Sequence, residues 1–508
     1  MISRLLRGAT LGIGCLLAVS PSRLDAQSSH HHVRHASAVV PAVRANAPRT
    51  LGALQDNLKG QLHSRARRGH WGILVVSLTR GDTLFSVSPD IQVQPASTMK
   101  LFTSSLALER LGPDYQFSTD VLRDGPLDAD GVVQGNLFLR GDGDPSLSPR
   151  FFPGDAGGPM RQLAQAVAVA GVRHVRGDIV GDATAFDGQR IPSGWLTRYL
   201  TLSYAARVSA LALNDNIAFV AVSPGTTGRA AVVALEPSSS AVPILNGVRT
   251  VVGSSGARVA IHSRGDGTIE ARGWIGALAR KRTYEIVVED PALFTVGAFR
   301  DALKAQGIVL DGTVRLARAP KTALRVTALR SPPLARIIAA MNRESINNYA
   351  ELLFRDAVRG PDRLETGSAD LGGQLLQHFL TTRAGVAPDA IVVADGSGLS
   401  TIDRVTPRAM VNLLGYADTA PWGMTLHASL PVAGESELLR NRMRQTAAQG
   451  NLHAKTGTTN NVIALGGYVT ALDGELLAFS FIYNGTDRWN AKATIDGMGA
   501  TLASFVRE

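Results

Sequence analysis

Residues 95–112 have the sequence PASTMKLFTSSLALERLG. Apolar residues follow Ser97 at helical spacing and Gly112 ends the run, so the stretch predicts a helix from Ser97 to about Leu111. Ser97 and Lys100 are three residues apart and therefore share one face of this helix, where the amine can take the hydroxyl proton. In the first turn, free backbone N–H groups and the helix dipole favour negative charge that develops at Ser97.

Two shorter strings follow much later in the chain. Ser345 and Asn347 lie two residues apart, on a segment that can direct both side chains into one cleft. Lys455, Thr456 and Gly457 are predicted to lie on a strand, where they supply a cation, a hydroxyl and a residue without a side chain that lets substrate approach the backbone. Each string alone is common, and a helix cap explains the second one equally well. All three in this order are typical of a serine acyl-transfer site whose base is lysine.

These strings predict a role for each polar side chain. Ser97 is the expected nucleophile and Lys100 its base, whose ordinary pKa near 10.4 must be lowered by burial and by a neighbouring cation. Lys455 is the candidate for that cation. Ser345 is expected to complete the proton path, and Asn347 to hold a substrate amide.

The third string also supplies a binding site. We expect Lys455 to bind a substrate carboxylate, with the hydroxyls of Thr456 and Thr458 beside it and Gly457 between them. The backbone N–H groups of Ser97 and Thr458 can form an oxyanion hole. We expect no metal ion and no cofactor.

The spacing of the strings predicts inserted domains. Ser345 follows Ser97 by 248 positions, far more than one helix needs, whereas Lys455 follows Ser345 by only 110. Residues 164–182 and 300–318 share a pattern of helix, glycine and strand, so they predict one α/β domain that a strand-rich segment interrupts. We therefore predict a multi-domain α/β chain, in which an α+β domain with an antiparallel sheet flanked by helices is split by two nested inserts. The predicted boundaries are a signal peptide at 1–26, a flexible lead-in at 27–49, the α+β domain at 50–116 and 322–508, an inserted α/β domain at 117–185 and 286–321, and a nested β-rich domain at 186–285.

Further elements are predicted from apolar patterns and turn residues. Those that bear on the site are strands at 71–78, 82–87 and 476–483, a hairpin of 453–458 with 462–470, and helices at 334–341, 348–358 and 493–506.

The N-terminus predicts export to the periplasm or the cell envelope. Arg4 and Arg7 precede an apolar run at 9–19, and small residues up to Ala26 offer a cleavage site, although an uncleaved anchor is an alternative. The chain's single cysteine, Cys15, lies in that run, so the mature protein is expected to be stable without disulfides. A histidine cluster after the run is either a solvated tail or a metal ligand.

The composition of the chain restricts the classes of binding partner that we expect. With 52 Lys and Arg against 42 Asp and Glu, the formal net charge is +10. This basicity favours anionic envelope polymers or, at most, peripheral contact with a membrane surface, although genomic composition bias explains it as well. No nucleic-acid module is present in the sequence, so we expect no nucleic-acid partner. No oligomeric state is predicted.

The chain resembles the penicillin-binding D-alanyl-D-alanine carboxypeptidase/endopeptidase family (low-molecular-mass class C penicillin-binding proteins). The resemblance covers residues 50 to 508 and rests on the three strings together with GNLFLRGDGDPSLS (135–148), RGDIVGDATAFDG (176–188), ESINNYAELL (344–353), DGSGLS (395–400), LPVAGESELLRNRM (430–443) and HAKTGTTNNVIALGGYV (453–469). It implies a serine β-lactamase/transpeptidase-like fold and an attack of Ser97 on the peptide between two D-alanines of peptidoglycan stem peptides. It also implies cleavage of D-amino-acid cross-links and covalent inhibition by β-lactams.

Two other functions remain open. A β-lactamase uses the same nucleophile, but the 248-residue spacing and the lack of an assignable deacylating Glu after Ser345 argue against it. A non-catalytic envelope-binding protein could keep a disused site, although all the motif side chains are intact. Within the α/β insert, the loop with Asp142 and Asp144 either forms a turn or faces substrate.

Overall fold

The computed structural model describes residues 47–64 and 68–508. The predicted signal segment and residues 27–46 of the predicted lead-in lie outside the described residues. Within the described part, no helix is both long enough and apolar enough to cross a bilayer.

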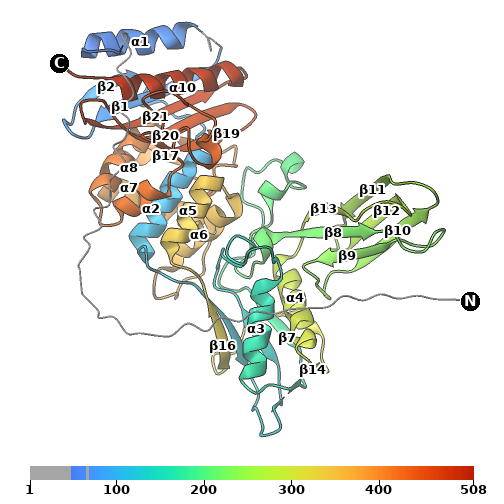
Figure 1. The fold of residues 1–508 in the computed structure, drawn as a ribbon. Coiled ribbons are helices and arrows are strands. Elements are labelled where there is room, and N and C mark those ends of the chain that lie inside the picture. The colour runs from blue at the N-terminus through green and yellow to red at the C-terminus, as the bar shows by residue number, and fades with distance from the viewer. Residues whose placement is uncertain (1–46, 65–67) are drawn as a thin grey trace, which may run out of the picture. The chain divides into compact units, whose positions relative to one another are not determined.

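The main sheet has five strands in the order β19-β20-β21-β1-β2, and every neighbouring pair is antiparallel (Figure 1). Strand β1 from the start of the described chain thus pairs with β21 near its end. The predicted hairpin of 453–458 with 462–470 is confirmed. The strands are β1 (His70–Ser77), β2 (Thr83–Val87), β19 (His453–Thr458), β20 (Val462–Thr470) and β21 (Leu476–Asn484).

Helices cover both faces of the main sheet. Ile73 and Val75 belong to the core that α1 (Leu51–Ser64) and α10 (Arg488–Ser504) close, whereas Leu74 belongs to the core on the opposite face. Because side chains alternate along a strand, burial on both faces gives nearly continuous apolar sequence in β20 and β21. Helix α10 starts five residues before the predicted position.

The second face packs against a group of helices built around α2 (Met99–Leu111). Residues 99–108 of α2 are all buried, so this helix runs through the core and not along its surface. A short 3-10 turn, η1 (Ala96–Thr98), precedes it, and the two together fill the predicted helix. The surrounding helices are α5 (Leu334–Glu344), α6 (Asn347–Arg359), α7 (Ala369–Arg383), α8 (Pro407–Thr419) and α9 (Gly423–Ser429). A two-stranded ribbon of β17 (Ile391–Val392) and β18 (Arg404–Val405) completes this part.

A second five-stranded sheet, the insert sheet, has the order β15-β7-β5-β3-β16. Strands β15, β7 and β5 are parallel, while β3 and β16 add antiparallel pairs. A small parallel sheet has the order β14-β6-β4, and its strands alternate in the sequence with those of the insert sheet. Their strands are β3 (Ser118–Arg123), β4 (Val132–Val133), β5 (Leu137–Arg140), β6 (His174–Val175), β7 (Ile179–Asp182), β14 (Val309–Leu310), β15 (Val314–Leu316) and β16 (Leu324–Arg330).

The repeat seen in the sequence is present in the structure. Helix α3 (Gly158–Val169) leads into β6 and β7, and helix α4 (Pro291–Ala305) leads into β14 and β15 in the same way. The equivalent strands pair in parallel, β14 with β6 and β15 with β7, so the two units stack side by side.

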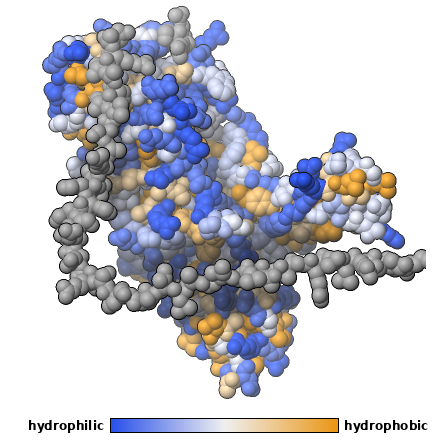
Figure 2. All heavy atoms as spheres, viewed as in Figure 1, coloured by the Kyte–Doolittle hydropathy of each residue, from blue (hydrophilic) through white to orange (hydrophobic). Residues whose placement is uncertain are grey.

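The segment of the chain between the two units forms two three-stranded sheets, β13-β8-β9 and β10-β12-β11, which lie to one side of α3 and α4 in Figure 1. Their strands are β8 (Ile217–Ser223), β9 (Val232–Glu236), β10 (Ile244–Val251), β11 (Ala257–Ser263), β12 (Ile269–Gly276) and β13 (Arg282–Val287). On the face shown in Figure 2, apolar residues form separate small patches among hydrophilic ones.

The division into domains stays a prediction. One strand bears on its boundaries, because β16 starts two residues after the predicted boundary at 322 and pairs with β3 of the insert sheet. Its sequence LRVTALR alternates apolar and polar residues from Leu324 to Ala328, and its register with β3 shifts between Arg325 and Thr327.

Candidate active site

Ser97 lies where η1 passes into α2, at the start of a buried helix. The preceding residue, Ala96, has a φ of 47°, in the left-handed region that alanine rarely adopts. Surrounding packing must hold such a conformation. The backbone of Gly398 packs directly against Ala96, so closely that a Cβ at this glycine would overlap the Ala96 carbonyl. The backbone thus presents the half-buried Ser97 hydroxyl at the N-terminus of the helix.

The Lys100 amine is the centre of the site. Its Nζ donates hydrogen bonds to Ser97 Oγ at 3.1 Å, to Asn347 Oδ1 at 2.6 Å and to the Ser397 carbonyl at 2.8 Å. The side chain is fully buried. The predicted contact between nucleophile and base is therefore present, and the amine points into the protein.

The second motif lies at the junction of α5 and α6. Ser345 ends α5 with a φ of 61°, again left-handed, and Asn347 is the first residue of α6. This sharp turn directs the Asn347 amide to Lys100 and the Ser345 hydroxyl to the third motif. Lys455 Nζ donates to Ser345 Oγ at 2.9 Å and to the Thr456 carbonyl at 3.0 Å.

The third motif lies on β19, the edge strand of the main sheet. Gly457 lies against the nucleophile's segment, because a Cβ there would be 2.7 Å from the Pro95 carbonyl oxygen. Strand alternation places Lys455 and Gly457 on one face and Thr456 and Thr458 on the other. Thr456 is buried, and Thr458 is exposed at the end of the strand. An edge strand leaves backbone groups unpaired, to which an extended peptide can add.

Burial dominates the protonation of both lysines. It lowers the pKa of Lys100 to about 7, while the attraction of three buried carboxylates, Asp395, Glu351 and Asp403, opposes that shift. Burial also lowers the pKa of Lys455 well below its ordinary value, and the charge of Lys100 lowers it further. The sequence predicted a lowered pKa for Lys100 from burial and a cation; in the structure the dominant cause is burial.

A loop at residues 395–400 supplies the third acceptor for Lys100, and one carboxylate shapes it. Asp395 Oδ1 accepts from the backbone N–H groups of Ser397 at 3.0 Å and Gly398 at 2.6 Å. Its Oδ2 accepts from the Ser400 N–H at 2.7 Å and from the Trp195 indole N–H at 2.7 Å. Asp395 is fully buried, and Trp195 comes from the segment between β7 and β8.

That same segment contacts the site at a second place. Asn347 Nδ2 donates to the Tyr204 carbonyl at 2.8 Å. Residues 193–204 therefore hold both the loop behind Lys100 and the amide of the second motif. The family resemblance included the loop at 395–400 but gave Asp395 no role, and sequence reasoning did not identify Trp195 or Tyr204 as part of the site, because single buried residues leave no periodic signal.

Two of the carboxyl groups behind Lys100 have raised pKa values and are therefore partly protonated at neutral pH. Burial raises the pKa of Glu351 to about 7, and the charge of Asp395 adds to this, although Glu351 pairs with the buried Arg355 at 3.0 Å. Burial and the same Asp395 charge raise the pKa of Asp403 well above its ordinary value. The cluster thus carries less than its full negative charge at neutral pH, which weakens its pull on the Lys100 proton.

A cavity of about 620 Å³ opens beside the second motif. The catalytic side of its wall is formed by residues 344–348, and Arg150 and Tyr204 come from the insert. Arg150 bridges Asp215 and Glu344 across the two parts. The site therefore adjoins a space large enough for a short peptide.

Comparisons with known proteins agree with this geometry. The model of the D-Ala-D-Ala carboxypeptidase 3 (S13) family matches residues 54–505. The D-alanyl-D-alanine carboxypeptidase of Actinomadura sp. (strain R39) is 35% identical over 483 residues, covering 92% of this chain and 87% of the relative. The D-alanyl-D-alanine carboxypeptidase DacB of Haemophilus influenzae is 24% identical over 420 residues, covering 82% of this chain and 85% of the relative.

Among solved structures, the crystal structure of penicillin binding protein 4 from Haemophilus influenzae matches with a TM-score of 0.74 at 22% sequence identity. The match covers 88% of this chain and 98% of that chain. It shows the same fold and confirms the predicted fold class. The chain belongs to the D-Ala-D-Ala carboxypeptidase 3 (S13) family, as the resemblance of its motifs predicted.

Proposed function

We propose that the protein is a serine D-Ala-D-Ala carboxypeptidase that cleaves peptidoglycan stem peptides through an acyl-enzyme on Ser97. The family match and the 35% identical relative support the activity. The observation that carries the mechanism is the fully buried Lys100 amine, 3.1 Å from the Ser97 hydroxyl. With a pKa near 7, a substantial fraction of this amine is neutral at neutral pH and can act as a base.

Acylation follows from these contacts. Neutral Lys100 takes the Ser97 proton while Oγ attacks the carbonyl of the penultimate D-alanine. The oxyanion of the tetrahedral intermediate is stabilised by the backbone N–H groups of Ser97 and Thr458. Ser345, hydrogen-bonded to Lys455, relays to the leaving amine the proton that Lys100 took, so that the C–N bond breaks, free D-alanine departs and Lys100 is neutral again.

The remaining groups bind the substrate and complete the cycle. Asn347 holds a substrate amide, and Lys455 with Thr456 and Thr458 attracts the terminal carboxylate along the edge of β19. Water then attacks the acyl-enzyme, and Lys100 takes a proton from this water and returns it to Ser97 Oγ as the bond to the shortened peptide breaks. β-Lactams acylate Ser97 in the same way, with their amide bond in place of the D-Ala-D-Ala peptide.

We place this reaction in the cell envelope, on the basis of the predicted export signal and the substrate. The test is mass analysis of products from defined muropeptides. Release of one D-alanine from a pentapeptide supports carboxypeptidase activity, and separation of cross-linked dimers adds endopeptidase activity. Rapid multiple turnover of penicillin without release of D-alanine identifies a β-lactamase and contradicts the proposal.

A further inference from the structure

A second cavity, of about 600 Å³, lies at one edge of the insert sheet and has no part in the proposed reaction. It opens beyond the carboxyl ends of the parallel strands β5, β7 and β15. Arg140 is the last residue of β5, Asp182 is the last of β7, and Arg318 follows β15 by two positions. In open α/β sheets this edge is where ligands bind, since loops diverge there and leave a crevice.

Three of the acidic side chains that line this cavity, Asp120, Asp142 and Asp182, are held by hydrogen bonds to the protein, whereas the exposed Glu365 makes no side-chain hydrogen bond or ion pair within the described residues. Asp120 pairs with Arg140 at 2.6 Å. Asp142 pairs with Arg359 at 2.7 Å and with Arg363 at 2.8 Å. Asp142, for which the sequence left open a turn or contact with substrate, joins the insert to the end of α6 through these ion pairs.

Three cations on the same wall have no such partner. Arg318, Lys321 and Arg330 line the cavity, are exposed, and make no side-chain hydrogen bond or ion pair within residues 47–64 and 68–508. Like charges gathered in a concave surface repel one another, and this repulsion costs folding free energy. An anionic ligand would remove that cost.

The backbone holds these cations in place. Buried Asp182 accepts from the Ala319 N–H at 2.9 Å, which fixes the loop that carries Arg318 and Lys321 to the end of β7. Arg330 lies directly opposite Ser118 in the register of β16 with β3. The cavity thus has a preformed cationic wall, with the hydroxyl-bearing Thr184 beside it.

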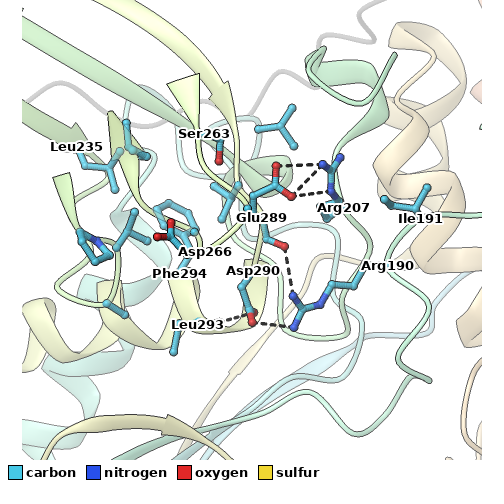
Figure 3. Close-up of a pocket in the computed structure, with 18 residues that line it drawn as sticks. Arg190, Ile191, Arg207, Leu235, Ser263, Asp266, Glu289, Asp290, Leu293 and Phe294 are labelled. Carbon is cyan, nitrogen blue, oxygen red and sulfur yellow. Dashed lines mark hydrogen bonds and ion pairs between the residues drawn. The ribbon is translucent and has the colours of Figure 1, made fainter. Parts of the chain in front are cut away.

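Another cavity shows the contrast. The pocket in Figure 3, of about 370 Å³, also contains two arginines, but both are already paired. Arg207 binds Glu289 through the Nε–Nη2 edge of its guanidinium group at 2.9–3.1 Å, and Arg190 binds Asp290 at 2.7 Å. Those guanidinium groups are used within the protein, whereas the three cations at the edge of the insert sheet are not.

We propose that the cavity bounded by Arg318, Lys321 and Arg330 is an anion site that binds an oxyanion, carboxylate or phosphate, of an envelope polymer. Guanidinium groups match planar carboxylate and phosphate oxygens with two parallel hydrogen bonds, which favours these groups over other anions. Binding of the oxyanion itself is independent of the proposed function; its assignment to an envelope polymer rests on it. The site holds the polymer on the insert while a stem peptide reaches Ser97.

The test compares two triple variants of the full chain. The site variant is Arg318→Gln, Lys321→Gln and Arg330→Gln. The control variant removes the same charges elsewhere, through Arg229→Gln, Arg258→Gln and Lys304→Gln, all exposed and without side-chain partners in the described residues. Titration calorimetry with inorganic tripolyphosphate at low ionic strength measures the site directly. We expect the site variant to bind at least about ten-fold more weakly and the control less than about two-fold; equal losses, or none, overturn the proposal.

Sedimentation with sacculi then identifies the source of the anion. Hydrofluoric acid removes phosphodiester-linked polymers from sacculi, so that carboxylates are the only anionic groups left on them. If the site variant loses binding to stripped and untreated sacculi alike, the anion is a carboxylate; if it loses binding only to untreated sacculi, the anion is a phosphate. Unchanged binding to both, beside the control, overturns the assignment to an envelope polymer. Both variants are expected to release D-alanine from a small peptide at the wild-type rate, so failure of the proposed function is seen separately.

Discussion

The acylation rate of Ser97 is expected to increase with the fraction of buried Lys100 that is deprotonated. Only the neutral amine can accept the hydroxyl proton, so the rate rises as pH increases through the pKa of Lys100. With a pKa of about 7, the neutral fraction grows from about one-tenth at pH 6 to about nine-tenths at pH 8, and then levels off. A lysine at its ordinary pKa would instead give a hundred-fold rise, roughly, over this interval, with no plateau before pH 10.

Stopped-flow measurement of the second-order rate constant for a fluorescent penicillin, from pH 5 to 9.5, distinguishes the two profiles. Asp395→Asn provides a second check, because this carboxylate is the largest attraction that keeps the Lys100 pKa up. Its removal is expected to move the midpoint below the wild-type value, while Asp130→Asn, an exposed carboxylate on the insert, leaves it in place. A rate that still climbs ten-fold per pH unit above pH 8 refutes the argument from burial.

Three further substitutions test the rest of the site. Ser345→Ala removes the hydroxyl between the third-motif lysine and the leaving group, and we expect kcat for D-alanine release to fall about 10²- to 10⁴-fold with little change in KM; an unchanged kcat removes this residue from the proton path. Gly457→Ala places a methyl group 2.7 Å from a backbone oxygen of the nucleophile's segment, so both penicillin acylation and Tm are expected to drop, and a variant with wild-type values of both contradicts the close approach. Trp195→Phe removes the indole hydrogen bond to Asp395, of a charge-assisted type worth about 1.5–3 kcal/mol, together with part of a buried ring. Acylation is expected to slow about ten-fold at unchanged penicillin Kd, whereas Trp489→Phe, 81% exposed, has no effect; identical behaviour of the two variants argues against a positioning role for the buried indole.

Much of the site was predictable because its chemistry uses short strings with fixed spacing. Ser97 and Lys100 share a helix face by geometry alone, and the order of the three motifs implies that Ser345 and Lys455 join them. The family resemblance supplied the fold, which no local pattern specifies. The long gap before Ser345 and the repeated helix-strand units likewise indicated inserts.

What the sequence did not predict is held by contacts between distant segments. Asp395 accepts hydrogen bonds from its own loop and from Trp195, and no periodicity links residues 200 positions apart. The left-handed turns at Ala96 and Ser345 were also unpredictable, since neither residue favours that conformation and only packing imposes it. Strand β16 was not among the predicted elements, because the pattern after about Arg325 was interpreted as helical although residues 324–328 alternate.

The central claim, that three distant motifs form one lysine-primed serine site, is tested most directly by locating a penicillin adduct with peptide mass spectrometry. We predict a single adduct per chain, on the peptide that contains Ser97, and none in Ser97→Ala under the same conditions. An adduct on any other residue, or full labelling of the alanine variant, would contradict the claim.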